Sequence, residues 1–148
     1  MAAFLVDTNV LAYAYEAGDA AKASRARACI RLLGASRNGV VSAQILGEFF
    51  VVATRRLRPP LSAREAEQIA MNLSRSWTVL DVTAAAALEA MRAAQQYQFQ
   101  YFDGLIWATA KLNGVPNVLT EDLPSGSLVE GIRFEDPFDA RFDLTRLD

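Results

Sequence analysis

The sequence predicts an α/β domain with a parallel sheet, and three observations support this class. Strand-like and helix-like stretches alternate along the chain, the first strand ends abruptly at an acid, and 52% of the 148 residues are hydrophobic. Parallel α/β sheets bind ligands beyond the carboxyl ends of their strands, because the connecting loops splay apart there. No repeat, linker or low-complexity segment divides the chain, so we expect one domain over residues 1–148, of which 139–148 form a tail.

The composition narrows the possible chemistry. The chain has no histidine and a single cysteine, Cys29, which excludes histidine-based zinc sites, Ser-His-Asp hydrolysis and an internal disulfide. Carboxylates are therefore the expected catalytic groups. The net charge of −2 means that a nucleic-acid partner would need a local basic patch. No apolar run approaches the ~18 residues of a membrane span, and the start of the chain lacks a basic secretory signal, so we expect a cytoplasmic protein.

The N-terminal part begins with a buried strand at Phe4–Val6, which stops at Asp7. A short helix from Leu11 to Tyr15 and a longer helix from Ala20 to Leu33 are predicted to follow. The longer helix carries cations off its apolar stripe, namely Lys22, Arg25, Arg27 and Arg31. For these cations the sequence favours a solvated basic face over contact with RNA.

A strand at Val40–Val41 leads into a helix from Ala43 to Arg56, which Ser42 is expected to cap. One side of this helix carries Ile45, Phe49, Val52, Ala53 and Arg56. Glu48 lies at the flank of that stripe. Burying an unpaired carboxylate costs several kcal/mol, so Glu48 either meets donors or cations in a site or rotates outward to pair with Arg55. The basic residues between Arg55 and Pro59 are suited to stabilising the C-terminus of this helix or to contacting phosphates, and both roles are compatible.

The second half of the chain is predicted to hold three helices and three strands. The helices start at Ser62, which forms a capping box with Glu65, at Thr83, and near residue 102, and the strands cover 77–82, 115–119 and 132–134, the last at the sheet edge. The inner face of the last helix is expected to carry Phe102, Leu105, Ile106, Thr109 and Ala110. Asp103 falls in its first turn or at its cap, where the helix dipole favours a carboxylate. Asp122 follows the strand at 115–119 and by itself also suits the N-cap of a short turn.

Four acidic motifs together resemble those of a PIN domain, most closely of the VapC toxins of bacterial toxin–antitoxin pairs. They are Asp7-Thr8-Asn9, Glu48 within 46–50, Asp103 within 102–106 and Asp122 within 120–123, and the resemblance extends over about residues 4–138. It implies a three-layer α/β/α sandwich with a central parallel sheet of strand order 3-2-1-4-5. In that order strands one and four are neighbours, which brings Asp7 and Asp122 to one crevice. Gly104 and the longer tail depart from the family pattern.

Converging acids need a cation. Two carboxylates ~4 Å apart repel by ~4 kcal/mol at an effective dielectric of 20, and Mg²⁺, or Mn²⁺ as a substitute, relieves this repulsion through oxygen ligands. We assign Asp7, Asp103 and Asp122 as metal ligands and Glu48 as a fourth catalytic acid that binds a second metal or positions the water. The side chains expected to orient these carboxylates are Thr8, Asn9 and Thr120.

The resemblance implies a metal-dependent endoribonuclease toxin that hydrolyses phosphodiester bonds of single-stranded or looped RNA. It also implies inhibition by a small VapB-type antitoxin and a homodimer, for which the Ala-rich helices would suit an interface. One alternative stays open: a non-catalytic PIN-like interaction module, because sequence does not show that the acids converge. A receiver-type phosphotransfer domain ranks far below, since Asp7 is followed by Thr-Asn and Lys111 lies within a helix.

Overall fold

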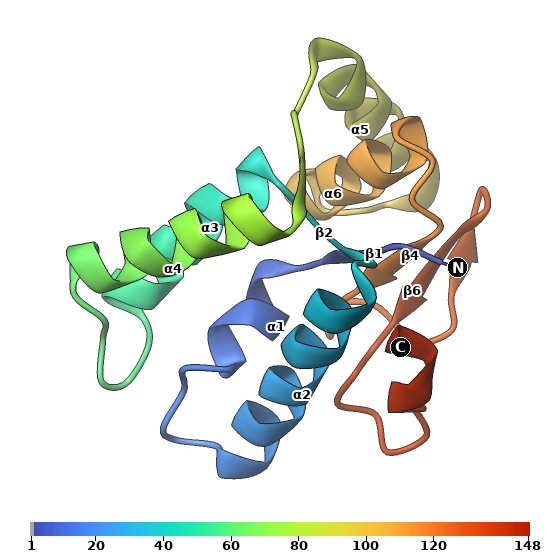
Figure 1. The fold of residues 1–148 in the computed structure, drawn as a ribbon. Coiled ribbons are helices and arrows are strands. Elements are labelled where there is room, and N and C mark those ends of the chain that lie inside the picture. The colour runs from blue at the N-terminus through green and yellow to red at the C-terminus, as the bar shows by residue number, and fades with distance from the viewer. Residues whose placement is uncertain (1) are drawn as a thin grey trace.

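A six-stranded sheet forms the centre of the computed structural model, which describes residues 2–148 (Figure 1). The strands are β1 Phe4–Val6, β2 Gly39–Ser42, β3 Thr78–Leu80, β4 Asn117–Leu119, β5 Leu128–Val129 and β6 Ile132–Glu135. Their order in the sheet is β3-β2-β1-β4-β6-β5. All neighbouring pairs are parallel except β5 and β6, which are antiparallel.

Helices cover both faces of the sheet. They are α1 Thr8–Tyr13, α2 Ala20–Ser36, α3 Ala43–Arg55, α4 Ala63–Ser76, α5 Ala84–Tyr97, α6 Tyr101–Leu112 and the 3-10 helix η1 Leu144–Leu147. In Figure 1, α1 and α2 lie on one side of the strands, α5 and α6 lie on the other, and the α3–α4 pair projects past the end of the sheet. The predicted α/β/α layering is confirmed. Among residues 2–148, no helix combines the length and apolarity that crossing a membrane requires.

The observed strand order differs from the predicted 3-2-1-4-5 by one additional strand. The predicted fifth strand is β6, and it lies beside β4 as expected, with Leu119 opposite Glu135. Its prediction as an edge strand was wrong, because β5 pairs with its other side. The hairpin closes through Glu130 and Gly131, both with positive φ (48° and 86°), the backbone that a two-residue hairpin turn requires. A strand of two residues is too short to give an alternating pattern in the sequence.

Two glycines let neighbouring elements approach closely. A Cβ at Gly39 in β2 would lie 2.6 Å from the Trp77 ring, so only glycine fits beneath that indole. A Cβ at Gly104 in α6 would lie 3.3 Å from the carbonyl oxygen of Ala90 in α5. Gly104 therefore fits the close packing of α5 on α6, which accounts for its departure from the family pattern.

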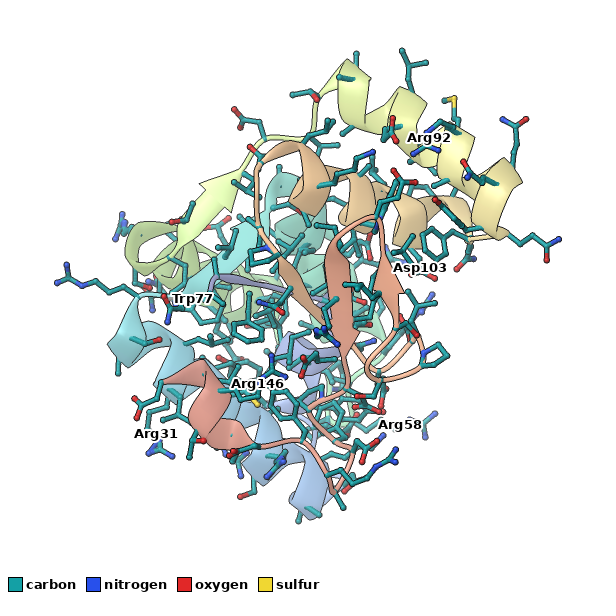
Figure 2. All side chains as sticks on the ribbon, turned by 90° about the vertical axis from the view of Figure 1, so that its right-hand side faces the viewer. Arg31, Arg58, Trp77, Arg92, Asp103 and Arg146 are labelled. Atoms are coloured by element: carbon teal, nitrogen blue, oxygen red, sulfur yellow. The ribbon has the colours of Figure 1, made fainter. Side chains whose placement is uncertain are left out.

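The C-terminal tail packs back onto α2. Arg25 donates hydrogen bonds to the carbonyl oxygens of Pro137 (2.7 Å) and Phe142 (2.6 Å), and the Ser36 hydroxyl donates to the Leu147 carbonyl (2.8 Å). The η1 helix, which carries Arg146, lies beside α2 in Figure 2. The prediction of a solvated basic face on α2 was therefore wrong for Arg25, because the tail uses that cation as an anchor.

Candidate active site

Asp7 connects the first strand to the first helix. Its Oδ1 accepts a hydrogen bond from the Thr8 backbone N–H (2.7 Å), which makes Asp7 the N-cap of α1. Its Oδ2 accepts a hydrogen bond from the Thr120 hydroxyl (2.7 Å). Asp7 is only 5% exposed. The predicted helix start at Leu11 was three residues too late, because the cap residue already begins the helix at Thr8.

Three acids meet at the carboxyl edge of the sheet. β1 and β4 are parallel neighbours with Val6 opposite Leu119, so the residues that follow each strand emerge side by side. Asp103 joins them from the first turn of α6, at the N-terminal end of that helix. One carboxylate oxygen from each of Asp7, Asp103 and Asp122 can be chosen so that all three lie within 4.8 Å of one another. The convergence that sequence alone left open is therefore present.

Burial and the charges of neighbouring acids disfavour the charged states of Asp7 and Asp103. Burial is the main reason that the pKa of Asp7 rises from 3.8 to about 7. The hydrogen bonds from Thr120 and Thr8 lower this pKa, whereas the charges of Asp122 and Asp103 raise it further. Partial burial also raises the pKa of Asp103, and the nearby charges of Asp122 and Glu48 add to the effect. Without a cation, the Asp7 carboxyl is therefore partly protonated near pH 7.

Glu48 faces the other acids from α3. Its carboxylate accepts hydrogen bonds from the Gln44 amide (2.6 Å) and from the Thr8 hydroxyl (3.4 Å). The alternative in which Glu48 turns outward to Arg55 is therefore wrong. Glu48 is near enough to raise the pKa of Asp103, although it is not part of the three-oxygen group.

The acids line a cleft of about 370 Å³, a volume in the range of small-ligand sites. Its apolar wall consists of Ala12, Val52, Leu57 and Ile106. Phe102 also lines the cleft and is 59% exposed, so its prediction as an inner-face residue of α6 was wrong. Arg56, predicted on the apolar side of its helix, is exposed and borders the cleft as well.

Of the three side chains expected to orient the acids, Thr8 and Thr120 do so. Asn9 lines the cleft, but its side-chain oxygen and nitrogen are buried and have no hydrogen-bond partner within residues 2–148. An unsatisfied buried amide beside three carboxylates is costly unless something polar binds there. Carboxylate and amide oxygens are the donors that Mg²⁺ and Mn²⁺ prefer, so the residues present fit a hard divalent cation.

Two supporting contacts escaped sequence reasoning. Gln44 donates both to Glu48 and to the carbonyl oxygen of Phe102 (3.2 Å), and so ties α3 to the first turn of α6. The contact with Glu48 could have been predicted from the sequence, because side chains four residues apart on a helix are neighbours. Lys22 pairs with Glu121 (2.8 Å), next to Asp122, across 99 residues of sequence. No local pattern reports a contact over that separation.

Comparison with protein families identifies the family to which this fold belongs. The PIN domain family model matches residues 4–123, and the chain belongs to that family. No curated protein gave a significant match. The class of protein is therefore the PIN domain, a family of nucleases, and the cluster of three acids is present in this chain.

Solved structures of VapC toxins are similar to this chain. VapC20 of Mycobacterium tuberculosis, described as a sarcin-ricin loop cleaving toxin, is 25% identical with a TM-score of 0.61 over 78% of this chain and 87% of that one. A DNA-bound VapBC from Salmonella typhimurium is 21% identical with a TM-score of 0.64 over 93% and 99% of the two chains. A toxin-antitoxin complex from Klebsiella pneumoniae is 18% identical with a TM-score of 0.63 over 93% and 98%. At these lower identities the last two show a shared fold.

Proposed function

We propose that this protein is a metal-dependent endoribonuclease and the toxin of a VapBC-type toxin–antitoxin pair, acting in the cytoplasm. The observation that carries the proposal is the convergence of Asp7, Asp103 and Asp122 within 4.8 Å from three separate parts of the chain. The likeness to a VapC toxin that cleaves RNA supports the substrate class. A non-catalytic interaction module would have no need to keep a buried acid whose pKa is raised to about 7.

Each acidic residue has a distinct task in this proposal. Asp7 is the central metal ligand, because Thr8 and Thr120 fix both of its oxygens, and Asp103 and Asp122 complete the donor set. A bound Mg²⁺ or Mn²⁺ supplies Lewis acidity for attack of water on the phosphorus. Glu48 positions the attacking water and accepts its proton as the new P–O bond forms, and the leaving oxygen takes up a proton from solvent as its bond to phosphorus breaks.

The decisive experiment is RNA cleavage by the purified protein with Mg²⁺, with Mn²⁺ and with EDTA. We expect cleavage that requires the metal and falls by at least a hundredfold, about 3 kcal/mol of lost transition-state stabilisation, in Asp7→Asn and Asp103→Asn. Asp81→Asn is a matched control, because Asp81 is an exposed acid outside the cleft. Cleavage that persists in EDTA, or in both site variants, would refute the proposed role of the metal and the acids, and a wild type that does not cleave RNA with either metal would favour the interaction module.

The same proposal includes protein partners. Two of the similar structures are complexes of a toxin with its antitoxin, which supports a VapB-type antitoxin as partner here. Co-purification of this chain with the product of an adjacent small gene, and loss of RNA cleavage on mixing, tests this. Exposed Leu88 (66%) and Met91 (47%) on the Ala-rich helix α5 support a homodimer, which sedimentation of the wild type and of Leu88→Glu tests.

A further inference from the structure

The first turn of α6 presents an aromatic ring to the cleft. Phe102 directly precedes Asp103, and 59% of its surface is exposed. The ring does not sit on a loose segment. Gln44 donates a hydrogen bond to its carbonyl oxygen (3.2 Å), and Tyr101 contacts its ring edge-to-face at 5.1 Å between centroids. Phe102 is therefore an apolar ring that is held in place and exposed to solvent beside the acidic residues.

The opposite end of the cleft presents a cation. Glu48 and Val52 in α3 and Arg56, its C-cap, recur every fourth residue and all line the cleft, so they follow one side of the helix and its end over about 12 Å. Arg56 is exposed, and within residues 2–148 no carboxylate forms an ion pair with it. An unpaired guanidinium at the rim of an acidic cleft offers a planar set of donors that matches a phosphate.

Resting on the function proposed above, we propose that the cleft binds one unpaired RNA strand across the acids, with a base stacked on Phe102 on one side and a backbone phosphate on Arg56 on the other. Phe102 then determines the preference for unpaired RNA. In a duplex the bases are stacked on one another and are not available to a protein ring, whereas a looped base can be splayed out onto it. Because Phe102 on α6 and Arg56 at the end of α3 line different parts of the cleft, the bound strand spans more than one nucleotide.

Binding of a fluorescently labelled single-stranded RNA, followed by anisotropy with Mg²⁺ in the Asp7→Asn background that does not turn over, tests both contacts. Phe102→Ala and Phe102→Leu should each raise the Kd by about five- to a hundredfold, and Phe102→Trp should restore binding, because base–aromatic stacking needs a π face. Leu128→Ala is the matched control, since Leu128 on β5 is an equally exposed apolar residue (59%) that does not line the cleft.

Salt dependence separates the two roles. Arg56→Ala should reduce the slope of log Kd against log salt concentration by about one, the contribution of a single phosphate contact. Phe102→Ala should leave that slope unchanged. If the wild type neither binds nor cleaves RNA, the proposed function itself fails. If the wild type cleaves RNA, but Phe102→Ala and Phe102→Leu bind the single strand as tightly as their parent, the stacking role is refuted while the nuclease stands.

Discussion

Replacing Asp7 by Asn should stabilise the metal-free protein at neutral and alkaline pH. The Asp7 carboxyl has a folded-state pKa of about 7 against an ordinary value of 3.8, chiefly because of burial. The folded state therefore binds more protons than the unfolded state between these values. Stability of the metal-free protein must fall as pH rises from about 4 through 7, since an ever larger share of the folded molecules must hold a buried charge.

The size of the effect follows from the two pKa values. Their difference corresponds to about 4 kcal/mol of lost stability between pH 4 and pH 8, at 1.36 kcal/mol per pKa unit. Asn keeps an oxygen that can accept from the Thr8 N–H and presents an amide to Thr120, whose hydroxyl can turn to accept from it. The variant thus removes the buried charge without removing the cap, and the greater part of the pH slope should disappear.

Urea unfolding of both proteins at several pH values between 5 and 8, in EDTA, measures this difference. Adding Mg²⁺ should reverse the slope for the wild type, because metal binding requires deprotonated carboxylates, and should change the variant far less. A wild type whose stability in EDTA is constant over this range, or an Asn variant less stable than the wild type at pH 8, would refute the account of Asp7 as a strained buried acid.

Substitutions at four further positions test other parts of the structure. Gly39→Ala should cost about 1–3 kcal/mol in urea unfolding because its methyl group collides with Trp77, whereas Gly47→Ala, with open space around it on α3, should stabilise by up to about 1 kcal/mol. Thr120→Val should weaken Mg²⁺ binding in calorimetry about ten- to a hundredfold while Thr120→Ser retains it, since the hydroxyl orients the central carboxylate. Arg25→Ala should make the C-terminal tail sensitive to limited proteolysis, and unchanged resistance would mean that the carbonyl contacts are dispensable.

The candidate acids were named from the resemblance of four motifs taken together, because the local signal of each acid alone also suits a helix cap or a turn. Asp7 ends an apolar run, and Asp103 falls in the first turn of a strongly patterned helix. Apolar spacing predicted the helices themselves, whereas their arrangement on both faces of the sheet came from the family resemblance. That spacing could not show which arc of α6 faces a cleft instead of the core, so Phe102 was misplaced. Contacts such as Lys22 with Glu121 depend on the topology and leave no trace in local sequence.

The two outer strands of the sheet have a consequence for how other molecules can attach. β3 and β5 are three and two residues long, and so offer very little free main chain for pairing. A peptide that extends a sheet needs a longer ladder of main-chain hydrogen bonds. A protein that covers this molecule must therefore engage side chains on its helices and loops, and the same short borders protect neighbouring copies from fusing into a continuous sheet at high concentration.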